Sequence, residues 1–385
     1  MPVRRRLALV FPGFEPLPVE AHCARFIREA KRTAAAYSMT LSMSDPVYSE
    51  AGLRVGTIAA DASGEGWHTQ TEIVVYGLGD LNAAYAARNP VMRLLTGLSA
   101  LADFILTGTF FRFVWTSWRY SLFFLYPLIT LFGVLAIAVA IGLFLPVSAA
   151  IRWCAAALVF IGLLWLASKR MYFLLMMDDW AFARDMAREK RPDVAERIAA
   201  VAADMERRLS APDLEEIVLA AHSFGAITVM LAMASLLSKG RDMRGAGLLT
   251  VGSSLLKVAL HPAASRLRQA VGIIAKSPVA WVDCQSLTDP MNFYGSKPLH
   301  TLGIGEGREA RTVHVRFRTQ LKPETYRAIK HDFFRVHRQF VYGVEKRNPY
   351  SFHAILCGPE PFAAFAERGK LSESWPPFCN TEKSR

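Results

Sequence analysis

Cysteine is scarce in this chain and follows no metal-binding or disulfide pattern. The cysteines are scattered along 385 residues, and no two are spaced as C-x-x-C. Their odd number and wide spacing argue against a disulfide framework and a structural zinc site, and are typical of a reducing compartment. They are Cys23, Cys154, Cys284, Cys357 and Cys379.

Charged residues are also few. They make up 20% of the chain against 52% hydrophobic residues, a balance typical of membrane segments joined to a globular part. The net charge of +12 suits either an anionic membrane surface or nucleic acid. Because the chain has no zinc-finger spacing and no compact basic-aromatic motif, the sequence favours membrane lipid as its partner and predicts no nucleic-acid binding.

Charge is missing altogether from residues 121–145. This run is long enough to cross a bilayer as one helix, since a span needs about 20 apolar residues. A second apolar segment, residues 147–168, reaches spanning length if Arg152 extends its charged end to the membrane surface. We therefore predict a transmembrane helical hairpin. The alternative is a buried helical hairpin in a soluble core, which so long an uncharged run disfavours.

The flanks of this hairpin are basic, whereas the short loop between its helices carries only Arg152. By the positive-inside rule, both outer parts of the chain are expected on the cytoplasmic side. An interfacial helix is expected over residues 100–118, so the whole membrane insertion covers residues 100–177. The basic flanking residues are Arg112, Arg119, Lys169 and Arg170.

Outside the hairpin, strand-like and helix-like segments alternate, which predicts an α/β fold with a mostly parallel sheet flanked by helices. The expected strands include RLALVF, a possible pair YSMTLSM and GLRVGTIAA, and TEIVVYGL before the hairpin, then EEIVLAA, LLTVGSS, VAWVDCQ and TVHVRFR. Neither part holds a complete sheet. Residues 1–99 and 178–368 are therefore expected to join into one domain, followed by a flexible tail at residues 369–385.

Ser223 lies in the segment AHSFG, between the expected strand EIVLAA and a long apolar helix. A nucleophile elbow needs this context, and its tight turn requires small residues two positions before and after the serine. Ala221 and Gly225 occupy those positions, with Ala221 in place of the usual glycine. Ser223 is thus a candidate nucleophile. The alternative is a serine that only caps a buried helix.

Two further segments resemble the α/β-hydrolase superfamily, in particular its lipase-like branch. LLTVGSSL, residues 248–255, is similar to the strand ending in T-x-G-S-P that follows the nucleophile helix in many lipases, with Ser254 in place of the proline. VFPGF, residues 10–14, is similar to the strand and turn that carry one oxyanion donor. Since the hairpin lies outside the common fold, the chain resembles membrane-anchored members with such an insertion.

This resemblance implies that an acidic residue and then a histidine follow the serine along the chain. Asp289 lies in a loop after the strand VAWVDCQ and is preferred to Asp283, which lies within the strand. The alternative for Asp289 is that Asp289-Pro290 merely starts a turn. Its implied role is to orient the imidazole of the histidine and to stabilise the imidazolium.

Two histidines, His331 and His337, are candidates for the base. Residues 334–341, FRVHRQFV, resemble an F-R-x-H-x-Q-F/Y-V segment of membrane-anchored members, so His337 is the expected base and His331 the reserve. His314 lies within an expected strand and is interpreted as a packed or surface histidine.

The resemblance also implies oxyanion donors, namely the backbone N–H of Phe224 and one at Gly13 or Phe14. The implied function is a lipase- or esterase-like serine hydrolase that cleaves an acyl ester or thioester, such as a lipid, by a Ser-His-Asp triad. The alternative is a non-catalytic membrane protein that uses the fold as a binding or assembly module. No cofactor and no metal are implied.

Two other polar groups are interpreted as structural. Asp178 and Asp179 have no third ligand spaced to form a metal site with them. His22 and Arg25 follow Glu15 on the first expected helix and could line the mouth of a site. A solvated helix face is the favoured interpretation.

Overall fold

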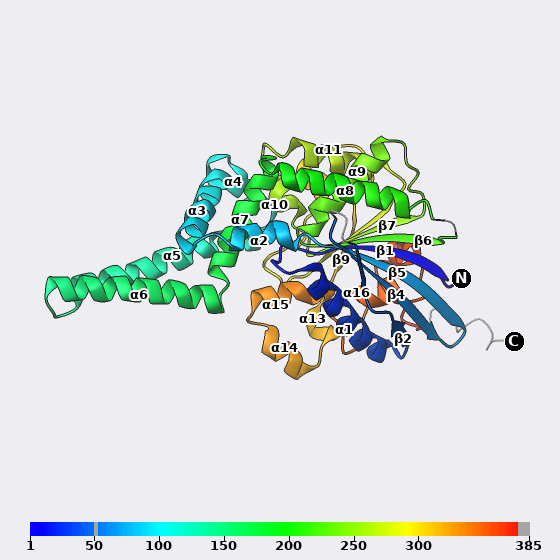
Figure 1. Ribbon diagram of the computed structural model, residues 1–385, viewed down its shortest axis with the longest axis horizontal. Coiled ribbons are helices and arrows are strands. Elements are labelled where there is room, and N and C mark those ends of the chain that lie inside the picture. The colour runs from blue at the N-terminus through cyan, green and yellow to red at the C-terminus, as the bar shows by residue number, and fades with distance from the viewer. Residues whose placement is uncertain (50–52, 212, 376–385) are drawn as a thin grey trace.

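The computed structural model describes residues 1–49, 53–211 and 213–375. Its strands are β1 Arg5–Phe11, β2 Thr40–Met43, β3 Val47–Ser49, β4 Val55–Gly64, β5 Trp67–Tyr76, β6 Glu216–His222, β7 Ala246–Val251, β8 Ala280–Gln285 and β9 Arg311–His314. In the described chain they form one nine-stranded sheet of order β2-β4-β5-β1-β6-β7-β8-β9, with β3 paired to β4 (Figure 1). The strands β5, β1, β6, β7, β8 and β9 run parallel to one another. The strands β2, β3 and β4 are antiparallel to their partners. The predicted α/β fold with a mostly parallel sheet is confirmed.

The parts of the chain before and after the hairpin share this sheet, because β1 pairs with β5 on one side and β6 on the other. Successive side chains in a strand point to opposite faces, and both faces are apolar here. Leu219 and Leu248 are buried on one face, and Val218 and Leu249 on the other. Each face therefore needs its own layer of helices.

The helices supply these layers (Figure 1). Residues of α8, α9 and α11 pack on the first face, and residues of α1, α16 and α17 on the second. The helices are α1 Val19–Tyr37, α2 Gly79–Ala86, α3 Pro90–Leu106, α4 Thr109–Thr116, α5 Trp118–Phe144, α6 Ala149–Arg170, α7 Phe173–Ala187, α8 Pro192–Arg208, α9 Gly225–Ser238, α10 Leu255–Ala259, α11 Ser265–Lys276, α12 Pro298–Leu302, α13 Phe317–Gln320, α14 Pro323–Ile329, α15 Phe333–Arg338, α16 Phe352–Cys357 and α17 Phe362–Arg368, with the 3-10 helix η1 at Gln339–Val341.

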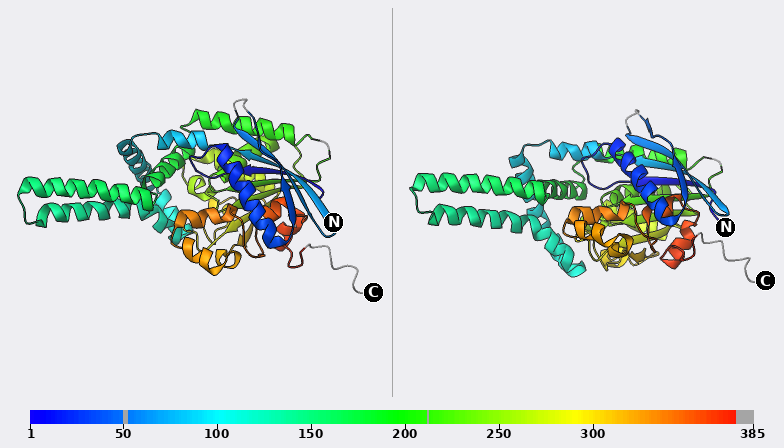
Figure 2. Two further views of the ribbon diagram at one scale, coloured as in Figure 1. Left: turned by 60° about the horizontal axis from the view of Figure 1, so that its bottom comes forward. Right: turned by 90° about the horizontal axis from the view of Figure 1, so that it is seen from below.

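Helices α5 and α6 form the expected hairpin and project from one end of the domain (Figures 1 and 2). Among the described residues, these two helices are each long and apolar enough to cross a membrane. Apolar side chains cover their outer surface, such as Phe132 at 62% and Leu158 at 71% exposure. The bounds differ slightly from the expected spans, because α5 begins at Trp118 and α6 ends at Arg170.

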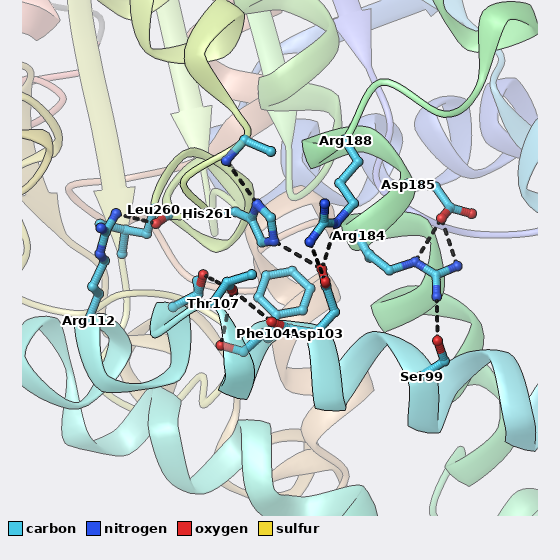
Figure 3. A network of polar contacts seen from close by, with 12 residues as sticks. Ser99, Asp103, Phe104, Thr107, Arg112, Arg184, Asp185, Arg188, Leu260 and His261 are labelled. Atoms are coloured by element: carbon cyan, nitrogen blue, oxygen red, sulfur yellow. Dashed lines mark hydrogen bonds and ion pairs between the residues drawn. The ribbon is translucent and has the colours of Figure 1, made fainter.

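The segment before the hairpin differs from the single interfacial helix expected over residues 100–118. It forms two helices, α3 and α4, bent by 73°. Gly108 lies at the bend with a φ of 75°, a left-handed conformation that ends α3. One side of α3 is fastened to the domain through Asp103, which pairs with Arg188 at 2.5 Å and His261 at 3.0 Å (Figure 3).

The first residues of the expected flexible tail pack against the domain. Leu371 is 2% exposed, and the Trp375 ring packs edge-on against Tyr37 and Trp67. Burial of these large apolar side chains holds the chain in place through residue 375. Residues 376–385, with Cys379, lie outside the described residues.

Candidate active site

Ser223 occupies a sharp turn between β6 and α9. Its φ is 53°, the left-handed region that a residue other than glycine seldom adopts. The turn is stabilised on both sides by the neighbouring strand and its loop. The N–H of Ser223 donates to Val251 O at 3.1 Å, and the N–H of Ser254 donates to Ser223 O at 3.2 Å. The strained conformation is thus built into the carboxyl edge of the sheet.

Two glycines allow the backbone to pack closely around this turn. A Cβ on Gly225 would lie 2.0 Å from Phe11 O, so no side chain fits there. A Cβ on Gly13 would lie 2.8 Å from Ser223 Cβ. The small residue two positions after the serine therefore has a physical cause, and the turn after β1 lies directly against Ser223.

His337 and Asp289 meet beside this turn. Nδ1 of His337 lies 2.8 Å from Oδ2 of Asp289, and both side chains are almost fully buried. Since a carboxylate only accepts, Nδ1 carries a proton, and in the neutral tautomer Nε2 is then the acceptor. Oδ1 of Asp289 accepts from Met291 N at 2.9 Å, which fixes the carboxylate. The Asp289-Pro290 segment therefore both starts a turn and orients a histidine.

The histidine ring lies next to the end of β7, where the serine turn also lies. A Cβ on Gly252 would lie 3.1 Å from His337 Cε1, the ring carbon next to Nε2. In this structure Ser223 Oγ is hydrogen bonded to Ser254 Oγ at 3.1 Å. Among the described residues, buried Nε2 of His337 has no hydrogen-bond partner. The structure thus brings His337 to Asp289 and to the serine loop, without a bond from Ser223 to His337.

The other acidic and histidine candidates lie elsewhere. His331 is exposed in the turn before α15, and His314 is exposed on β9. Asp283 lies inside β8, where it accepts from Thr250 at 2.6 Å. It also accepts from Gln285 at 2.8 Å, and burial raises the pKa of this carboxyl.

The expected oxyanion donors surround the same turn. Phe224 directly follows Ser223, and Gly13 lies against Ser223 Cβ. The Phe14 ring packs against Phe224 with centroids 5.9 Å apart. In the described part of the chain, no other protein group accepts a hydrogen bond from the N–H of Gly13, Phe14 or Phe224. These three N–H groups therefore have no backbone acceptor among the described residues.

Sequence reasoning gave no role to His222, which lies immediately before the serine. Its Nε2 donates to the backbone carbonyl of His337 at 3.2 Å, and the two rings lie 4.6 Å apart. Burial holds the pKa of His222 well below its usual range, with His337 and Arg25 lowering it further. His222 is therefore a neutral side chain that positions the backbone of His337. The sequence feature that could have indicated this role is the position of His222 at the end of the strand, directly before Ser223.

Glu15 and His22 are buried and form a cluster with the partly buried Arg25, so the predicted solvated helix face is wrong. The Arg25 guanidinium contacts both oxygens of Glu15 at 2.7 and 3.0 Å, and it lies 2.8 Å from Nδ1 of His22. Burial, together with Arg25, lowers the pKa of His22 to about 4. A cavity of about 30 Å³ lies between this cluster, Pro12 and His222. This small cavity therefore separates the cluster from His222, the neighbour of Ser223.

The two aspartates after the hairpin form ion pairs with basic side chains of the chain. Asp178 pairs with Arg93 at 2.6 Å, and Asp179 pairs with the buried Lys257. Burial lowers the pKa of Lys257, and Asp179 opposes this shift. No group of three or more metal-ligating side chains occurs among the described residues. Lys257, which sequence reasoning missed, also lies 5.0 Å from the Phe224 ring centroid.

The base of the hairpin contacts the helix that carries His337. The Phe333 ring on α15 packs against Phe123 and Tyr126 of α5, at 5.7 and 5.5 Å between centroids. Tyr172, just after α6, donates to the carboxylate of Asp332 at 3.0 Å, which also caps the first turn of α15. We call Phe123, Tyr126, Tyr172 and Phe333 the aromatic junction.

Comparisons with known proteins add no identification. No family model matches the chain, and no curated protein or solved structure gives a significant match. The α/β fold, the two membrane-spanning candidates and the site geometry are therefore the basis for a functional proposal.

Proposed function

We propose that the chain is a membrane-anchored serine hydrolase of the lipase and esterase type. Ser223 is the nucleophile, His337 the base and Asp289 the residue that orients the base. The strongest support is the arrangement at the carboxyl edge of the sheet. A serine at positive φ lies between strand and helix, beside a His337–Asp289 hydrogen bond of 2.8 Å.

In the proposed reaction, the Ser223 hydroxyl first turns from Ser254 toward Nε2 of His337. His337 takes the hydroxyl proton while Oγ bonds to the carbonyl carbon of an ester or thioester. The N–H groups of Phe224 and of the turn at Gly13 stabilise the oxyanion. The intermediate then expels the alcohol or thiol, which takes the proton from His337. Water releases the acyl group by the same transfers and yields a free acid.

The proposed substrate is the acyl ester of a lipid or another amphiphile. The aromatic junction ties α15 to the base of the hairpin, so the proposed site lies near the end of the domain that faces the bilayer. A site held there meets amphiphiles at a high local concentration. The basic residues flanking the hairpin support a cytoplasmic position for the domain.

A fluorophosphonate probe, which reacts with activated serines, tests the proposal on the full chain in detergent micelles. The wild type should be labelled and Ser223→Ala should not. Asp289→Asn should label more slowly by about 10³-fold or more, because the imidazole loses the partner that fixes its tautomer. Ser253→Ala and His331→Ala are matched controls that should label like the wild type. A folded wild type that is not labelled would overturn the proposal.

One observation favours a second candidate, a non-catalytic binding module on the same fold. Ser223 is bonded to Ser254, and Nε2 of His337 is unpartnered. Ser254→Ala separates the two candidates. If the serine pair is only a resting arrangement, this variant should label at least as fast as the wild type. If the site is not catalytic, neither protein should be labelled.

A further inference from the structure

A wide groove lies along β9, away from the candidate active site. Its volume is about 960 Å³, and its lining comes from β9, the loop before it, the loop after η1 and the end of α17. Helices α5 and α6 contribute nothing to this lining. The groove is therefore separate from the hairpin and from Ser223.

The groove carries a strong excess of positive charge. Its side chains include five cations that form no ion pair with the described residues, and a sixth, Arg368, that is paired with Glu360. The single carboxylate of the lining, Glu309, already accepts from the N–H groups of Leu299, His300 and Ala310. The five unpaired cations are Lys297, Arg308, Arg311, Arg316 and Arg347. Such a group of like charges attracts an anionic partner.

The wall of this groove is an open strand edge. In the described sheet, β9 pairs only with β8. The N–H of Val315 donates to Gln285 O of β8, and alternate residues direct their backbone groups to opposite sides. The N–H and C=O of Thr312 and His314 therefore face the groove, where they can pair with an added strand.

We infer that the β9 groove binds an acidic, extended peptide segment of a partner protein. The segment adds as a strand to Thr312 and His314, while its carboxylates contact the surrounding arginines and lysine. A four-residue strand spans about 13 Å, so the segment needs only a few residues. The cations also repel basic chains, which makes the edge selective for acidic ones. This inference is independent of the proposed hydrolase activity.

Fluorescence polarisation on the full chain in detergent micelles tests the inference with a labelled peptide of alternating Glu and Thr. The peptide should bind at about 150 mM salt, whereas Lys-Thr and Gln-Thr peptides should not. The double variant R308E/R347E should weaken binding by about 10-fold or more, and R244E, an exposed arginine outside the groove, should not. His314→Pro should also weaken binding by about 10-fold, because proline removes the edge N–H yet is tolerated on an edge strand.

Four results would overturn the inference. Tripolyphosphate that displaces the peptide, together with full binding by His314→Pro, would identify a simple anion site. Equal binding of a Glu-Pro peptide would exclude strand addition. Vesicles of anionic lipid that need Arg308 and Arg347 for binding, without peptide binding, would identify a membrane surface. The last result is a wild-type chain that is folded by thermal unfolding and binds none of these probes. The cations would then serve only to prevent strand pairing at this edge.

Discussion

The hairpin and the sheet domain place the same kind of side chain in opposite surroundings. Leu249 on β7 is fully buried, whereas Leu158 on α6 is 71% exposed. In the domain, apolar side chains leave water by packing on one another, which stabilises the fold. In the hairpin they leave water only if lipid surrounds them. The comparison teaches that the domain contains its own apolar environment and the hairpin needs an external one.

The two regions meet at the aromatic junction. Here α15, a helix of the domain, packs against residues at the base of α5 and after α6. His337 lies on α15, so the junction links the apolar hairpin to the candidate base. The following predictions test the difference between the two regions, and then the junction, in order of decreasing effect.

The largest expected difference is between two identical substitutions. Leu249→Ala should lower the free energy of unfolding by about 2–5 kcal/mol, because it removes a fully buried side chain and leaves a cavity. Leu158→Ala should change it by less than about 0.5 kcal/mol in micelles, since its side chain packs on detergent rather than on the domain. Thermal unfolding followed by circular dichroism measures both. Equal losses would contradict the distinction between the regions.

The junction should give an intermediate effect. Phe333→Ala removes the ring that contacts α5 and Tyr172, and it should reduce the local stability of α15 by about 1–2 kcal/mol. Hydrogen exchange should show faster exchange of residues 334–338 with little change in β7. Phe111→Ala, at an exposed aromatic ring on α4, is the control and should leave α15 unchanged. If exchange in Phe333→Ala were unaltered, the contact with the hairpin would not stabilise the helix that carries the candidate base.

A smaller effect concerns acid stability of the domain alone. His353 is fully buried, both of its ring nitrogens lack hydrogen-bond partners among the described residues, and burial together with Arg25 lowers its pKa to about 3. The unfolded chain, with an ordinary histidine pKa, binds more protons between that value and about 6.5, so stability falls as the pH falls through this range. When the pH falls from about 7.5 to about 5.5, the free energy of unfolding of His353→Leu should decrease by about 1 kcal/mol less than that of the wild type.

The measurement for this prediction is thermal unfolding in micelles across the pH range. His331→Leu is the matched control, because His331 is exposed and its substitution should keep the wild-type dependence on pH. Parallel pH curves for His353→Leu and the wild type would show that His353 is not the group that destabilises the folded chain in acid.

Much of the architecture was predictable because it depends on local pattern. An uncharged run of spanning length predicts the hairpin, and alternating apolar segments predict the strands. The tight turn at Ser223 was predictable because Ala221 and Gly225 are small, and the close approach of Phe11 O explains why Gly225 is required. The break between α3 and α4 was missed, because Gly108 alone does not tell a bend from a tolerated glycine.

The candidate site was less predictable, since its members come from distant segments. The choice of His337 rested on a family resemblance, and its hydrogen bond to Asp289 joins residues 48 positions apart. Glu15, His22 and Arg25 carry charge or polarity that normally indicates a surface, so their burial was missed. Ser254 was noted only as a departure from the lipase pattern, although its hydroxyl contacts Ser223.

The sequence by itself determined the apolar hairpin of spanning length, the α/β order of elements and the small residues around Ser223. These depend on length, periodicity and side-chain size within a few neighbouring residues. Only the tertiary structure decided that His337 rather than His331 meets Asp289, that Glu15 and His22 are buried, and that β9 is an open edge with unpaired cations. Each of these depends on which segments pack together, and chain neighbours do not specify that packing.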